Sequence, residues 1–231
     1  MLCTELSKVK RSGKALVVEP LRCKRWTCET CRPMLQKMLI AKALGGEPTT
    51  FITLTIRASW GTVTEQAQRL VEAWRMIRQS YARQHHGYKI PFLAVFEAHP
   101  STGRPHLHIL CRANYIPQRW LSDRMRALAG SPVCDIRRVN GTRHAARYLA
   151  KYVGKDARKF NGTKRYWRSH DYDLRPKEAR TDRTATEVIV IREPYDRTLG
   201  HAAMNVVWRG TDVRNRRVEI DFRRHEVRWL C

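Results

Sequence analysis

The chain lacks any run of apolar residues that approaches the roughly 18 needed to cross a membrane. Its first 14 residues also lack the apolar core of a signal peptide. These absences argue against a membrane partner and favour a cytoplasmic protein. In that compartment the seven cysteines are expected to be reduced thiols or metal ligands instead of disulfides.

Acidic residues are also scarce. Asp and Glu number 21 against 45 Lys and Arg, which gives a formal net charge of +24 at pH 7. The basic residues are spread along the whole chain, and no repeat or low-complexity tail holds them. A folded protein with this charge is expected to bind a polyanion, most simply nucleic acid. At 231 residues the chain is long enough for one core domain with appendages.

The first 48 residues form a candidate appendage that is rich in cysteine. Cys23, Cys28 and Cys31 have a spacing at which their thiolates could hold one structural Zn²⁺ from a turn. Such a site takes four ligands, and Cys3 is the nearest spare thiol. A donor elsewhere in the chain, or no metal at all, remains an alternative.

Hydrophobic periodicity predicts a chain that contains both helices and strands. Thr62 and Glu65 have the spacing of a capping box, and Gly130 can end a helix. A charged loop is expected over residues 209–217. The remaining patterns predict helices over residues 33–44, 62–84 and 117–129, and strands over residues 50–56, 91–97, 106–111, 133–139, 186–191 and 218–222.

Two histidines alternate with apolar residues directly after a turn-rich segment. In a strand, His106 and His108 share one face of the sheet, and the leucine and isoleucine that follow them point to the other. Neighbouring imidazoles can ligate a metal, although structural histidines with satisfied hydrogen bonds give the same pattern. Pairing with the preceding strand would bring Glu97 within reach as a third ligand, unless it is a solvated residue at the loop edge.

A helix expected after Thr142 carries a second group of polar residues. Tyr148, Lys151, Tyr152 and Lys155 share one face at about 100° per residue. Two phenols and two ammonium groups side by side are unusual for a helix that only packs. An amphipathic helix with an aromatic rim is the alternative.

Basic and aromatic residues are interleaved beyond this helix. That arrangement suits a groove that follows phosphates and stacks bases, and it is also typical of a solvated surface. The candidates for DNA contact are Arg104, Arg147, Lys164, Arg165 and Trp167.

The strand FITLT, the segment PHLHIL and the helix YLAKYVGK occur in the order of the three motifs of the HUH (His-hydrophobic-His) endonuclease superfamily. The chain most resembles rolling-circle replication initiators of small single-stranded DNA phages and plasmids, in the form with two tyrosines in motif 3. The resemblance covers about residues 50–155. It implies an α+β core at 49–170 of the ferredoxin- or RRM-like type, in which a central antiparallel sheet has flanking helices and central metal-binding strands. A Cys-rich segment at 1–48 and a basic extension at 171–231 are expected outside that core, the extension with strands packed on it.

The resemblance also implies the chemistry. A divalent cation, Mn²⁺ or Mg²⁺, held by the two histidines and Glu97 would polarise a phosphate of single-stranded origin DNA. Tyr148 or Tyr152 would then attack phosphorus, giving a 5′-phosphotyrosine and a 3′-OH that primes synthesis. The other tyrosine would cut the regenerated origin, and Lys151 and Lys155 would stabilise the developing charge. No small-molecule cofactor is implied.

The sequence has no Walker-A loop, so unwinding is expected to fall to a host helicase and extension to a host polymerase in a bacterial cytoplasm. A transposase or a relaxase would share the cation and the nucleophile, and the paired tyrosines favour replication. A non-catalytic nucleic-acid-binding protein would explain the charge but not the joint presence of histidines and tyrosines. A histidine-triad hydrolase fits poorly, because position 110 is Leu.

Overall fold

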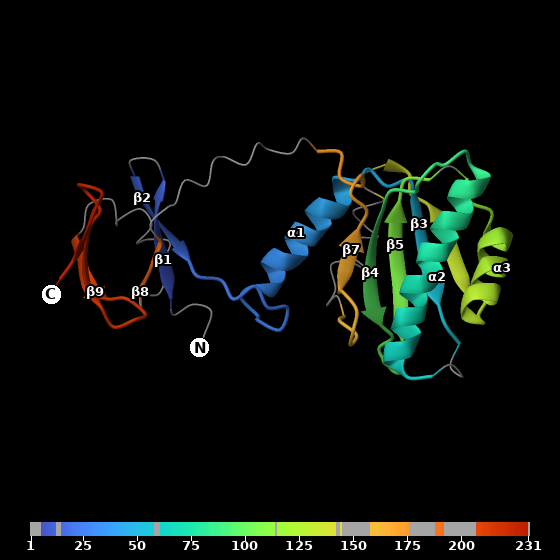
Figure 1. Cartoon of the computed structure of the whole chain (residues 1–231), viewed down its shortest axis with the longest axis horizontal. Helices are drawn as coiled ribbons and strands as arrows, with labels where there is room; N and C mark the ends of the chain where they lie inside the picture. Colours follow the sequence, from blue (N-terminus) through green and yellow to red (C-terminus); the bar gives the residue numbers. More distant parts are fainter. Residues whose placement is uncertain are drawn as a thin grey trace. The chain divides into compact units, whose positions relative to one another are not determined.

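The structure is a computed structural model of the chain, and it describes residues 6–12, 15–57, 61–113, 115–141, 144, 158–175, 188–191 and 207–230. These residues divide into two compact units, one from residues 35–176 and one from residues 1–34 and 177–231 (Figure 1). The described elements are helices and antiparallel strands, which confirms the predicted α+β class. No helix in the described ranges has the length and apolarity that crossing a membrane requires.

The larger unit is built on a five-stranded antiparallel sheet in the order β6-β3-β5-β4-β7. Its three inner strands come from the apolar runs that predict them, and β5 lies between β3 and β4. The two histidines therefore lie on the central strand. The strands are β3 (Thr50–Thr55), β4 (Phe92–Ala98), β5 (Pro105–Cys111), β6 (Cys134–Arg138) and β7 (Tyr166–Arg168).

Two amphipathic helices, α2 (Val63–Gln84) and α3 (Gln118–Ala129), pack on one face of this sheet. The predicted capping box begins α2, and a left-handed Gly130 with φ of 63° ends α3. Because side chains alternate along a strand, Leu107 and Ile109, which each follow one of the histidines, point into this core. Its fully buried members include Ile52, Leu54, Leu70, Trp74, Ile77, Leu107, Ile109 and Met125.

The helix α1 (Arg32–Leu44) runs along the other face of the sheet, which leaves α1 and α2 on opposite sides (Figure 1). Tyr166 pairs with Val95 in the sheet and so faces away from α2, and the ammonium of Lys42 lies 5.5 Å from its ring centre. The buried Tyr172 hydroxyl donates to the carbonyl of Ala43 at 2.7 Å. A Cβ at Gly46 would overlap the Tyr172 ring, so glycine is required at this close approach.

The smaller unit combines strands from both ends of the chain. Among its described residues, six buried apolar side chains form a core: Val9, Ile189, Ile191, Val218, Ile220 and Phe222. Its described strands form two antiparallel sheets. One sheet contains β1 (Ser7–Ser12), β2 (Ala15–Pro20) and β8 (Val188–Ile191). The other contains β9 (Val207–Thr211), β10 (Arg217–Asp221) and β11 (Glu226–Trp229).

This division differs from the three consecutive segments predicted at 1–48, 49–170 and 171–231. Pairing of β1 with β8 joins residues about 180 positions apart, and no local pattern announces it. The prediction of a charged loop over 209–217 was wrong at its start, because β9 continues to Thr211. In that strand the charged residue Arg209 is solvent-exposed, so its charge does not interrupt the pairing.

Candidate functional site

His106 and His108 lie on the face of the sheet opposite α2. Their partners on β3 are Thr55 and Thr53, and each threonine hydroxyl is within hydrogen-bond distance of the Nδ1 atom of its histidine. The Oγ1–Nδ1 distances are 2.9 Å for Thr55 with His106 and 3.1 Å for Thr53 with His108. The two rings are nearly parallel, with centroids 6.3 Å apart. The threonines thus occupy Nδ1 of both rings and leave Nε2 for another partner.

Glu97 is that partner for one ring. Its Oε2 atom lies 2.8 Å from Nε2 of His108, which is 4% exposed and stacked on Phe51. An ionised carboxylate can only accept a hydrogen bond, so Nε2 carries a proton in this contact. In the neutral ring Nδ1 is then an acceptor, and the Thr53 hydroxyl is its donor.

His99, in the turn that follows β4, is a third imidazole beside the pair. Its ring centroid lies 5.6 Å from that of His106. Two backbone N–H groups of the same turn donate to its Nδ1 atom at 3.3 Å, so the proton of the neutral ring is on Nε2. His99 is therefore placed as a hydrogen-bond donor and not as a metal ligand. Because no strand or helix pattern includes His99, its place beside the pair is not predictable from the sequence.

The electrostatic surroundings keep His106 unprotonated. Burial lowers the pKa of its imidazole, and the charges of His108 and His99 lower it further, while Glu97 opposes them. The ring is therefore neutral at pH 7, which is the form that ligates a metal.

The donor set of two imidazoles and one carboxylate suits a divalent cation. Hydroxyls that bind Nδ1 are the kind of outer contact that orients metal-ligating histidines. Among the described residues, however, these three donor atoms do not all lie within 4.8 Å of one another, and Glu97 contacts His108 directly. A cation on His108 requires loss of the Nε2 proton, and the Thr53 hydroxyl can then change from donor to acceptor.

The helix predicted to carry the two tyrosines lies outside the described residues. This applies to Tyr148, Lys151, Tyr152 and Lys155, to the DNA-contact candidate Arg147, and to the proposed fourth zinc ligand Cys3. Their roles stay predictions.

The structure brings together the three cysteines that are predicted, with Cys3, to bind zinc. The sulfur atoms of Cys23, Cys28 and Cys31 all lie within 4.8 Å of one another, and those of Cys23 and Cys31 are 3.8 Å apart. A hydrogen bond from the backbone N–H of Cys31 lowers the pKa of the Cys28 thiol to about 7.

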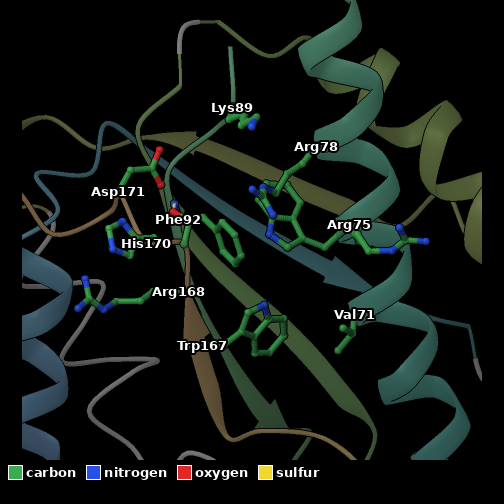
Figure 2. A pocket seen from close by; sticks show the side chains of 11 residues that line it. Val71, Arg75, Arg78, Lys89, Phe92, Trp167, Arg168, His170 and Asp171 are labelled. Atoms are coloured by element: carbon green, nitrogen blue, oxygen red, sulfur yellow. Dashed lines mark hydrogen bonds between the residues drawn. The ribbon is translucent and has the colours of Figure 1, made fainter. Parts of the chain in front are cut away.

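An open pocket of about 560 Å³ lies on the α2 side of the sheet. Figure 2 shows Val71, Arg75 and Arg78 of α2 on one side of it and Trp167, Arg168 and His170 on the other. The Arg78 guanidinium lies 4.3 Å from the centre of the Phe92 ring at its floor. Two donors in its lining have no hydrogen-bond partner among the described residues, namely Nε1 of the buried Trp74 and Nε of Arg78.

The remaining DNA-contact candidates divide between two places. Trp167 is half-buried, because it packs on Phe96 with ring centroids 5.5 Å apart, and it also lines the pocket. Exposed Lys164 lines an adjoining hollow of about 380 Å³. Arg104 lies in the turn between β4 and β5, where its carbonyl accepts from the His99 N–H at 2.8 Å, and Arg165 is partly exposed beside β7.

Comparison with known protein families gives a match within the larger unit. Residues 49–157, just under half of the chain, match the sequence model of a replication-associated protein family, that of the ORF2 type. The match is confined to this part of the larger unit. It spans β3 with its threonines, the hairpin with both histidines and the tyrosine segment. No curated protein and no solved structure matches the chain.

Proposed function

We propose that the protein is an HUH-type replication initiator that nicks single-stranded origin DNA. The observation that carries the proposal is the pair of β5 histidines, both held at Nδ1 by β3 threonines, within the segment that matches the replication-associated family. A plain binding module would need neither the oriented imidazoles nor the carboxylate beside them. A transposase or a relaxase with the same site is the alternative.

His106, His108 and Glu97 would hold Mn²⁺ or Mg²⁺, which as a Lewis acid polarises a phosphate oxygen. Thr53 and Thr55 contact Nδ1 of the two rings, which leaves both Nε2 atoms as ligands for the cation. The Nε2–H group of His99 donates to a second phosphate oxygen. These groups align the scissile bond and counter its developing negative charge.

The nucleophile in this proposal is the phenol oxygen of Tyr148 or Tyr152. Because an ordinary phenol has a pKa near 10, it needs help to lose its proton at neutral pH, and Lys151 and Lys155 supply positive charge for it. The new bond joins this oxygen to phosphorus, and the bond from phosphorus to O3′ breaks. The DNA 5′ end stays on the protein and the 3′-OH is released as a primer.

The pocket beside α2 is a suitable place for the DNA strand. Its aromatic walls can stack a base, and Arg78 and Lys89 can meet a phosphate. The unpartnered donors of Trp74 and Arg78 would gain an acceptor from a base carbonyl or a phosphate oxygen. Since the histidines face the other side of the sheet, a strand that occupies both sites passes around the β7 edge.

The test uses a random pool of single-stranded oligonucleotides, because the origin sequence is not given by the protein. With Mn²⁺, a label at the 3′ end is expected to become attached to the protein and to survive denaturation, whereas a 5′ label is released. Replacing both Tyr148 and Tyr152 by Phe should abolish the attachment and leave binding intact. Binding without any attachment by the unaltered protein would favour the non-catalytic alternative.

A further inference from the structure

The segment between β2 and α1 has almost no core of its own. No strand or helix occurs between Pro20 and Arg32, and of the eleven residues between them only Trp26 and Cys31 are buried. The chain nevertheless follows a defined path. The Cys28 N–H donates to the Arg25 carbonyl at 3.1 Å, and the Arg32 N–H donates to the Cys28 carbonyl at 2.8 Å. A segment of this kind usually needs a cross-link to keep one conformation.

The cysteines converge at this point. Lys24 adopts a left-handed conformation with φ of 53°, which turns the chain back directly after Cys23. The turn that follows Cys28 brings Cys31 to the start of α1 with its side chain fully buried. All three sulfur atoms lie within 4.8 Å of one another.

The sulfur separation fits a metal better than a disulfide. Two sulfur atoms bound to one tetrahedral Zn²⁺ at about 2.3 Å lie about 3.8 Å apart. The Cys23 and Cys31 sulfurs are 3.8 Å apart. A disulfide would bring them to about 2.05 Å.

We propose that the thiolates of Cys23, Cys28 and Cys31 hold one structural Zn²⁺. Within the described residues no fourth Cys, His, Asp or Glu joins the cluster, so the fourth ligand comes from outside those residues or from solvent. The ion cross-links the turn and fixes its exposed basic residues, Lys24, Arg25 and Arg32, at the start of α1. This site is independent of the nicking chemistry.

The first test is the metal content of the full-length protein, purified without chelators and measured by plasma mass spectrometry. About one zinc per chain is expected. Cys28→Ser and Cys31→Ser should each lose most of it, and the control Cys134→Ser, in the other unit, should retain it. A wild-type protein with no more than trace zinc after expression with added zinc would overturn the proposal.

Cobalt gives a second readout that does not depend on activity. Co²⁺ added to the metal-free protein should produce thiolate charge-transfer bands and the intense visible bands of tetrahedral coordination. The same bands are expected in Cys134→Ser and should be weakened in Cys28→Ser. A Co²⁺ spectrum without thiolate bands would contradict the three-thiolate site.

If Cys31→Ser fails to fold because its side chain is buried, limited proteolysis of the exposed-site variant Cys23→Ser still tests the proposal. The Cys23 side chain is exposed, so Cys23→Ser is expected to fold. A chelator should speed tryptic cleavage after Lys24 and Arg25 in the wild type and should have little effect in Cys23→Ser, which is already cleaved fast. Equal, chelator-independent cleavage of both proteins, or a Cys23–Cys31 disulfide in the intact mass under non-reducing conditions, would count against zinc.

Discussion

Thr55 Oγ1 lies 2.9 Å from His106 Nδ1, across two neighbouring strands of one sheet. Two residues further along the same pair of strands, the Thr53 hydroxyl contacts Nδ1 of His108 in the same way. The β3 strand therefore sets the orientation of both candidate ligands on β5. The FITLT segment therefore has a positioning role, which substitution of Thr53 or Thr55 can test.

Replacing Thr53 or Thr55 by Val keeps the side-chain shape and removes the hydroxyl. Each change should weaken Mn²⁺ binding by about 10- to 100-fold, because the ring loses the group that orients it. Isothermal titration with Mn²⁺ measures the loss, and Thr→Ser at the same position should restore most of the affinity. Unchanged affinity in both Val variants would show that the threonines only pack.

The pKa shift of His106 predicts a dependence of stability on pH. Its pKa lies below the ordinary 6.5 because of burial. As pH falls below 6.5, the unfolded chain takes up a proton on this residue before the folded protein does, so folding is destabilised. In His106→Asn this contribution is absent. The difference in unfolding free energy between wild type and variant should therefore shrink between pH 7 and pH 5 in urea denaturation, and a constant difference would contradict the assigned environment.

The pocket beside α2 predicts a local effect on DNA affinity. Arg78→Gln should weaken binding of a single-stranded oligonucleotide by roughly 10- to 150-fold, since a charge-assisted contact is worth about 1.5–3 kcal/mol. The slope of log affinity against log salt should also fall by about 0.7 for one lost phosphate contact. Arg83, exposed on the same helix and outside the pocket, is the matched control. Equal losses in Arg78→Gln and Arg83→Gln would indicate only general charge attraction.

Packing of α1 on the sheet predicts a stability effect far from the histidines. In Gly46→Ala the new methyl group overlaps the Tyr172 ring, and such overpacking costs about 1–3 kcal/mol. Thermal unfolding should show a clearly lower midpoint than for the exposed α1 variant Lys37→Ala. An unchanged midpoint would mean that Tyr172 moves aside without cost.

Local patterns predicted the parts of the fold that form locally. The capping box at Thr62, the stop at Gly130 and the β-branched run at 50–56 agree with the observed elements. The pairing of β1 with β8 was not predictable, because it depends on contacts between chain ends. The three-residue β7 is too short to give a periodic signal.

The same distinction applies to the candidate site. The juxtaposition of Glu97 with the histidines follows from strand alternation and one hairpin, and both can be read from the sequence. The threonine contacts depend on the register between β3 and β5, which lie about fifty residues apart in the chain. His99 depends on a turn conformation. Trp74 belongs to an apolar helical stripe, for which core packing was a sufficient explanation until its Nε1 atom was seen to lack a partner.

The most direct test of the central claim is to locate the residue that becomes attached to DNA. The protein is incubated with Mn²⁺ and the oligonucleotide pool, digested with nuclease and trypsin, and analysed by mass spectrometry. A nucleotide linked through its 5′ phosphate to Tyr148 or Tyr152 is the predicted result. Attachment at any other residue, or none while DNA binding persists, would contradict the proposed mechanism.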